Sequence, residues 1–158
     1  MTTALISHPD CLSHHNPDGH PERVDRLRAI EAVLAPVAGL DRVEAPLGTD
    51  DHVRLAHPAD YLAKIVAASP EAGFVTLDGD TNMSPGSLRA AFRAVGGIIE
   101  AVDRVIEGRA SNAFVATRPP GHHAETRTPM GFCLFGNVVI GARHALIHHG
   151  LSRVAIVD

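Results

Sequence analysis

Residues 113–124 read AFVATRPPGHHA: an apolar run, a loop with two prolines and a glycine, and two adjacent histidines. The run from Ala113 to Ala116 is short and apolar, as expected of a buried β-strand. The prolines fix the backbone and the glycine frees it, so the loop can hold an irregular shape. Neighbouring side chains of a strand point to opposite faces, so His122 and His123 need such a loop to face one pocket together.

Two segments that follow this loop complete a parallel α/β unit. Residues 138–149 predict a helix that Gly150 closes, and residues 153–157 predict a second buried strand. The order strand, helix, strand is typical of parallel sheets, which bind ligands at the carboxyl ends of their strands. We therefore expect Asp158 to lie beside the histidine pair, where its carboxylate would orient one imidazole for proton transfer.

The rest of the chain predicts further elements of the same domain. Patterns indicate strands over 2–6 and 42–44, a helix over 22–35, and a helix-turn-helix whose second helix begins at Pro58. Ser84 and Pro85 predict the N-cap and first residue of the longest helix, which ends at Gly108. Gly96 and Gly97 lower its helix propensity, which predicts a close contact with a neighbouring element.

The composition is that of one soluble domain covering residues 1–158, since 45% of the residues are hydrophobic and 20% are charged. A net charge of −4 and the lack of long basic clusters argue against a nucleic-acid partner. The apolar runs are too short to span a membrane, and the first ten residues lack a leader pattern. Cys11 and Cys133 are too few for a disulfide framework. We expect a cytoplasmic protein.

Eleven histidines suggest proton transfer or metal binding, and several alternatives stay open at this point. One group has the ligand types of a structural zinc site: Cys11, His14, His15 and His20. A polar loop with one buried cysteine is favoured there, because paired cysteines are missing. His144, His148 and His149 have helical spacing near a helix end, and we interpret them as surface residues.

The histidine pair has alternatives of its own. His122 and His123 could only cap a strand end through hydrogen bonds. Cys133 beside either histidine could instead act as the nucleophile of a thiol hydrolase, which would need a depressed thiol pKa.

Three motifs, in order along the chain, resemble the histone deacetylase superfamily. Residues 118–137, RPPGHHAETRTPMGFCLFGN, resemble its signature segment in the form seen in class II deacetylases, bacterial deacetylase-like amidohydrolases and acetylpolyamine amidohydrolases. Residues 20–27, HPERVDRL, resemble the early segment of the family. Asp80-Thr81 with Ser84-Pro85-Gly86 resembles the middle segment. Together the motifs cover essentially the whole chain.

The resemblance implies an α/β fold of the three-layer arginase-deacetylase type, with a catalytic zinc at the carboxyl edge of a parallel sheet. It implies hydrolysis of an N-acetyl amide, in acetyl-lysine or a similar acetylated amine, to amine and acetate. His122 and His123 match the tandem histidines that act as general base and as general acid or electrostatic partner, in either order. Asp158 matches the aspartate that pairs with the first histidine and helps hold a structural monovalent cation, K⁺. Iron suits similar ligands to zinc.

The resemblance also implies a substrate pocket. Gly131 and Phe132 match the lining of the acyl-lysine tunnel, where an aromatic face suits an aliphatic stem. Cys133 matches a residue of the inner pocket. Asp80 is matched to the carboxylate at the rim that grips the substrate backbone, and Arg26 to a buried arginine beneath the acetate pocket.

Two parts of the family pattern are missing from the chain. The zinc ligands of the family begin in an Asp-x-His motif just past the aspartate that Asp158 matches. Its oxyanion-stabilising tyrosine also lies downstream, and Tyr61 stands too early in the order. The chain is thus expected to be the amino-terminal part of a single deacetylase domain, truncated after a central strand, with apolar edges uncovered and no activity alone. An acetylpolyamine amidohydrolase and a non-catalytic truncated remnant remain alternatives.

Overall fold

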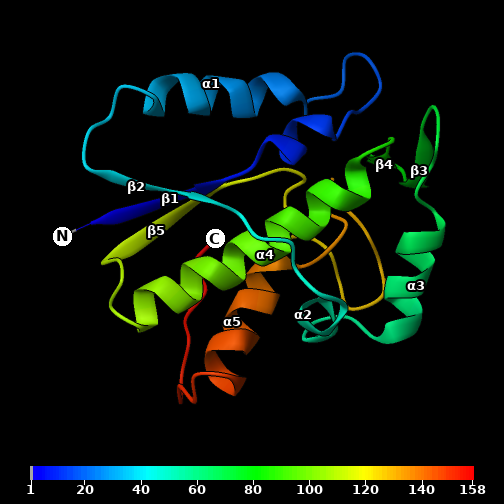
Figure 1. Cartoon of the computed structure of the whole chain (residues 1–158). Coiled ribbons are helices and arrows are strands. Elements are labelled where there is room, and N and C mark those ends of the chain that lie inside the picture. The colour runs from blue at the N-terminus through cyan, green and yellow to red at the C-terminus, as the bar shows by residue number, and fades with distance from the viewer. Residues whose placement is uncertain (1) are drawn as a thin grey trace.

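A small parallel sheet lies between two helical layers in the computed structural model, which describes residues 2–158. The sheet has the strand order β2-β1-β5. Its strands are β1 (Thr3–Ser7), β2 (Leu40–Glu44) and β5 (Asn112–Ala116), and both neighbours of β1 run parallel to it. Figure 1 shows α1 (Val24–Leu34) on one face and α4 (Ser87–Ile106) on the other, with α5 (Asn137–Ile147) packed against α4.

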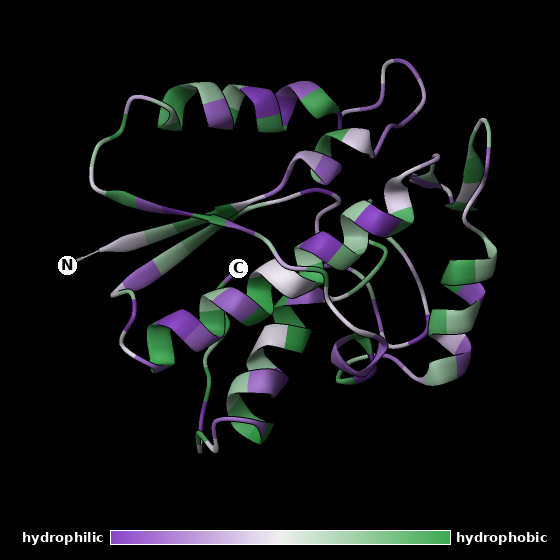
Figure 2. Cartoon of the chain, viewed as in Figure 1, coloured by the Kyte–Doolittle hydropathy of each residue, from purple (hydrophilic) through white to green (hydrophobic). Residues whose placement is uncertain are grey.

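The central strand alternates its side chains between the two layers, as a strand must. Leu5 joins a buried cluster with Leu27 of α1. Ala4 and Ile6 join another with Ala101 of α4. Green and purple bands alternate along α1 and α4 in Figure 2, the pattern of helices that bury one side. The predicted parallel α/β architecture is confirmed.

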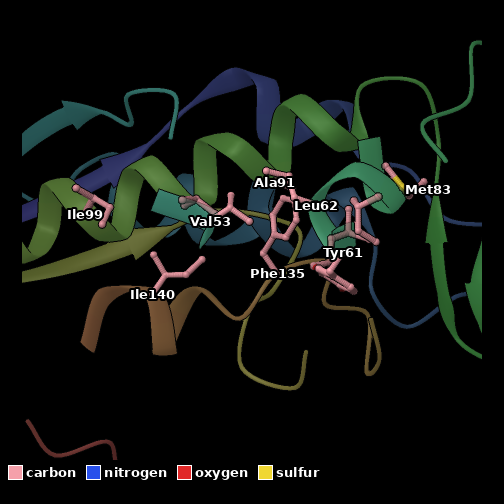
Figure 3. Close-up of a cluster of buried hydrophobic side chains, with 11 residues drawn as sticks. Val53, Tyr61, Leu62, Met83, Ala91, Ile99, Phe135 and Ile140 are labelled. Atoms are coloured by element: carbon pink, nitrogen blue, oxygen red, sulfur yellow. The ribbon is translucent and has the colours of Figure 1, made fainter. Parts of the chain in front are cut away.

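The remaining elements lie around the amino-terminal half of α4 (Figure 1). They are η1 (Pro9–Ser13), α2 (Asp50–Arg54), α3 (Ala59–Ala67) and the antiparallel pair β3 (Val75–Asp78) and β4 (Thr81–Met83). Figure 3 shows the largest buried cluster, in which Phe135 lies among side chains of α3 and α4 such as Leu62 and Ala91. No helix within residues 2–158 has the length and apolar character that a membrane crossing requires.

The two glycines inside α4 mark where this helix touches the rest of the fold. A Cβ on Gly96 would lie 2.0 Å from the carbonyl oxygen of Pro46, and one on Gly97 would lie 3.2 Å from Cγ1 of Val115. The helix therefore approaches both the chain after β2 and strand β5 at these residues. The close contact predicted from the sequence is confirmed.

The start of α4 differs from the prediction. The N-cap is Gly86, with φ of 92°, and not Ser84. A Cβ on Gly86 would lie only 2.8 Å from Cβ of Ser13, so the turn needs both the left-handed backbone and the absence of a side chain. The Ser84 hydroxyl accepts instead from the backbone N–H of His15 at 2.9 Å.

The predicted strand over residues 153–157 is wrong for this structure. The segment after α5 is extended but unpaired, and the exposed fractions of Val154, Ile156 and Val157 are 40%, 54% and 95%. A strand buried on both faces needs a partner strand and covering layers, and the described helices cover only the three strands already formed. An apolar run alone does not supply these neighbours.

Gly96→Ala tests the close approach of α4. Alanine normally gains up to about 1 kcal/mol over glycine in a helix. Here the added methyl must displace backbone, so we expect a net loss of about 1–3 kcal/mol in the free energy of unfolding, measured by denaturant titration. Gly97→Ala, whose added methyl meets only side-chain methyl groups at 3.2 Å or more, should cost less. A Gly96→Ala protein as stable as the parent would contradict this packing.

Candidate active site

The histidine pair lies in the loop that leaves the carboxyl end of β5 and ends at α5. The rings of His122 and His123 are side by side, with centroids 4.0 Å apart and planes tilted by 46°. Both side chains are exposed. Gly121, directly before them, accepts a hydrogen bond from the backbone N–H of Val138 at 3.0 Å and packs against Asn137. The first turn of α5 therefore fixes where the pair begins.

The backbone of residues 131–133 passes close beside His123. A Cβ on Gly131 would lie 2.6 Å from Cδ2 of His123, so only glycine allows the backbone to pass this ring. The backbone N–H of His123 donates to Sγ of Cys133 at 3.4 Å, and this thiol donates to the carbonyl of Gly131 at 3.3 Å. The structure thus brings together four of the residues singled out in the sequence.

Cys133 does not have the surroundings of a nucleophile. Its side chain is fully buried, and burial raises the pKa of the thiol. Its hydrogen bonds go to backbone groups and not to an imidazole. A thiol hydrolase needs an accessible thiolate, so this geometry argues against that alternative.

Phe132 and Asp80 meet at one rim beside the pair. Phe132 has φ of 69°, a strained conformation for an aromatic residue, and its N–H donates to the Thr81 hydroxyl at 3.1 Å. The rings of His20 and Phe132 pack edge to face, with their centroids 4.7 Å apart. His20 Nε2 donates to the Asp80 carbonyl at 3.0 Å. The Asp80 side chain is exposed, as a rim carboxylate must be.

The predicted role of Arg26 as the buried arginine needs correction. Arg26 is exposed on α1, where it borders a cavity of about 130 Å³. The buried arginine of this region is Arg118, with an exposed fraction of 4%. The two guanidinium groups border the same cavity, but only Arg118 has the partners that burial of a charge requires.

Arg118 forms a bidentate ion pair with Glu22, which is 1% exposed. Its Nη2 donates to Oε2 of Glu22 at 2.7 Å, and its Nε donates to Oε1. Its Nη1 donates to the carbonyl of Cys11 at 3.2 Å. The fork geometry and the extra acceptor compensate for the removal of both charges from water. The loop bearing the histidines is thereby tied to the segment before α1.

The ion pair of Glu22 and Arg118 continues into a chain of buried hydrogen bonds. His14 Nε2 lies 3.3 Å from Oε2 of Glu22 and its Nδ1 lies 2.7 Å from the Ser87 hydroxyl. Burial lowers the pKa of His14, so the imidazole is neutral. A carboxylate only accepts, hence Nε2 donates to Glu22 and Nδ1 accepts from Ser87. Burial opposes ionisation of Glu22, but the bonds from His14 and Arg118 outweigh it and lower its pKa to about 2.

His57 and Tyr61 hold the later part of the site loop, which is the segment 117–136 between β5 and α5. The N–H of Gly136 donates to His57 Nε2 at 2.9 Å, so Nδ1 carries the proton and donates to the carbonyl of Thr126 at 3.1 Å. Burial lowers the pKa of His57, which keeps it neutral. The Tyr61 hydroxyl donates to the carbonyl of Leu134 at 2.7 Å, and its ring stacks on His57 at 4.7 Å. Nothing in the sequence except the neighbouring helix signal at Pro58 pointed to these contacts.

Two sequence predictions find other surroundings in the structure. Asp158 is exposed and makes no hydrogen bond to His122 or His123, so its role stays a prediction. His14 and His20, two candidate ligands of a structural zinc, use their ring nitrogens in hydrogen bonds: His14 to Ser87 and Glu22, and His20 to backbone groups. Within residues 2–158, the groups of three or more candidate metal ligands include neither histidine of the pair.

Glu22→Gln tests the buried ion pair. The amide keeps the shape but leaves the guanidinium of Arg118 without a counter-charge, so we expect a loss of about 3–5 kcal/mol in the free energy of unfolding. Asp25→Asn, at an exposed pair with Arg28, is the control and should change it by less than about 1 kcal/mol. Equal effects of the two substitutions would contradict the assignment.

The same pair makes stability depend on pH. The folded-state pKa of Glu22, about 2, lies below the ordinary value of 4.5. Its contribution is therefore complete above 4.5 and is lost as the pH falls toward 2. Denaturant titrations across this range should show a steeper acid loss in the parent than in Glu22→Gln. Parallel curves would argue against a depressed pKa.

Known proteins are similar to this chain in sequence. Residues 20–158 match the family model described as "Histone deacetylase domain". The chain is 38% identical to the histone deacetylase-like amidohydrolase of Pseudomonas aeruginosa over 87% of this chain and 36% of that protein. It is 32% identical to the human polyamine deacetylase HDAC10, over 100% of this chain and 25% of that protein.

Solved structures give the same result. The crystal structure of the HDA15 HD domain matches with a TM-score of 0.81 and 33% identity, over 88% of this chain and 42% of that one. The chain thus spans less than half the length of each of these relatives. The arginase-deacetylase type of α/β fold expected from the sequence is confirmed, and the chain belongs to the histone deacetylase family.

Proposed function

We propose that this chain forms the histidine-bearing part of a zinc-dependent amidohydrolase that cleaves acetyl-lysine in peptides, or a similar acetylated amine, to amine and acetate. One observation carries the proposal: His122 and His123 stand side by side on a loop anchored by Glu22, α5 and His57. Deacetylases and amidohydrolases among the relatives support this class of reaction.

The histidine pair would move the protons of the hydrolysis. Attack of water on the acetamide carbonyl releases a proton, and the departing amine needs one. Two imidazoles in contact can divide these tasks, one accepting from the water and the other donating to the amine. Which of His122 and His123 takes which task stays open.

The rim beside the pair would hold the substrate. The face of Phe132, fixed by its bond to Thr81 and by His20, suits the aliphatic stem of acetyl-lysine. Gly131 leaves room beside the His123 ring. The exposed carboxylate of Asp80 would accept a hydrogen bond from the substrate backbone. Cys133 supports the inner wall through its bonds to His123 and Gly131.

Zinc, when bound, would polarise the acetyl carbonyl and activate the attacking water. The residues that the structure describes do not by themselves build such a site around the pair, since their candidate ligand groups leave out both histidines. Asp158 is proposed to orient the first histidine and to contribute to a K⁺ site, which would require a change in the extended segment after α5. We place the protein in the cytoplasm.

An acetylated polyamine is the second candidate substrate, because the relative from Homo sapiens is named a polyamine deacetylase. Turnover of an acetyl-lysine peptide and of acetylated putrescine by the complete gene product separates the two. We expect the peptide to be preferred, and its rejection would reverse the order.

His123→Ala in the complete gene product tests the role of the pair. Loss of a general acid or base should lower kcat about 10²–10⁴-fold. The free energy of unfolding should change little, because the ring is exposed. His15→Ala, another exposed histidine, is the matched control. Acetate release retained in His123→Ala would refute its proton-transfer role.

The 158-residue chain assayed alone, with added zinc, should release no acetate. Zinc-stimulated turnover by this chain would show that residues 1–158 suffice for zinc-dependent hydrolysis, and would overturn this part of the proposal.

A further inference from the structure

A second group of histidines lies at the carboxyl end of α5, away from the pair. His144, His148 and His149 each place one ring nitrogen within 4.8 Å of the others. The rings of His144 and His148 stack at 4.8 Å with 11° between their planes, as expected for residues four apart on a helix. The ring of His149 stands perpendicular to both.

The sequence suggested that His144 is a surface residue, and this is wrong: its exposed fraction is 6%. It faces α4, which packs against α5 (Figure 1). There its Nε2 lies 2.6 Å from Oδ1 of Asp103, and Nε2 of His149 lies 2.7 Å from the same oxygen. Burial opposes ionisation of Asp103, but the bonds from His149 and His144 outweigh it and lower the pKa of this carboxyl.

The three imidazoles lie close enough to share one cation, and the Asp103 carboxylate adjoins two of them. Two histidines at positions i and i+4 of a helix, a third histidine and a carboxylate give three nitrogens and one oxygen, which suits four-coordinate zinc. Zn–N bonds of about 2.0–2.1 Å place tetrahedral ligands about 3.4 Å apart. The three ligand nitrogens lie within 4.8 Å of one another, so they must approach by up to about 1.4 Å.

His148 can make that movement. It is exposed, and its ring nitrogens have no hydrogen-bond partner among residues 2–158. The other two imidazoles are already directed at one carboxylate oxygen. Hydrogen bonds to Asp103 account for the positions of His144 and His149. They do not account for the imidazole of His148, which lies beside the other two without a hydrogen bond of its own. A metal ion uses all three.

We propose that His144, His148, His149 and Asp103 bind a divalent transition-metal ion such as Zn²⁺, at a site separate from the histidine pair. His144 is seven residues beyond Asn137, the helix start that packs on Gly121, or about 10 Å along the helix axis. To bind the ion through Nε2, His144 and His149 would give up the protons that face Asp103, either to their own Nδ1 or to solvent. The ion would then join α5 to α4. Because α5 begins at the site loop, binding would stabilise the support of that loop.

Zinc titration of the metal-free 158-residue chain, without a polyhistidine tag, tests the proposal. We expect one Zn²⁺ per chain by calorimetry, and a higher melting temperature in its presence. His148→Ala removes an exposed side chain and should keep the fold while weakening binding by at least about 10-fold, the loss that even outer-shell substitutions produce. Asp103→Asn should weaken it too, and His15→Ala, the control, should not.

Cobalt substitution gives a readout that does not depend on affinity alone. Co²⁺ bound by three imidazoles and a carboxylate should give the intense visible absorption of tetrahedral coordination, and His148→Ala should lose it. Absence of saturable zinc binding would overturn the proposal. So would zinc binding of equal affinity in the parent and His148→Ala, because the ion would then occupy another site.

Discussion

The buried ion pair between Glu22 and Arg118 is the interaction on which the rest of the site depends. It joins the segment before α1 to the loop after β5, which are 96 residues apart in sequence. His14 and Ser87 extend it to the start of α4, where the Ser87 hydroxyl accepts from the backbone N–H of Ser84 at 2.8 Å. All three motifs of the family thus meet in one hydrogen-bonded network. Either charge left alone in this interior would be costly, so these segments gain stability only by folding together.

The position of the histidine pair follows from this anchor. Arg118 is held four residues before His122, and Gly121 is then held by the first turn of α5. His57 and Tyr61 bond to backbone groups of the loop just before α5. Loops position catalytic groups well only when such supports fix the backbone. The backbone on both sides of the histidine pair is therefore held by hydrogen bonds, although both side chains are exposed.

Local patterns predicted most of the elements because helices and strands follow from periodicity. The strands β1, β2 and β5 and the contact at Gly96 appear as expected. The burial of charged and polar side chains did not follow from such patterns. Arg26 and Arg118 both stand beside apolar residues, and only the tertiary partner Glu22 decides which is buried. Helical spacing likewise did not show that His144 faces α4 while Ile147 is exposed.

The strand expected before Asp158 failed for a related reason. Apolar residues predict burial, but a strand also needs a partner and covering layers, which are properties of the whole sheet. The contacts of Asp158 could therefore not be predicted from its neighbours. By contrast, the side-by-side arrangement of His122 and His123 was predictable, because the prolines and glycine of the loop are local constraints.

The most direct test of the central claim, that the pair of Glu22 and Arg118 organises the site, is a double-mutant cycle. The free energy of unfolding is measured for Glu22→Gln, Arg118→Gln, and both together. Strong coupling predicts that the double substitution costs less than the sum of the single ones by about 2–3 kcal/mol. Additive losses would mean that the two side chains act independently, and would contradict the account.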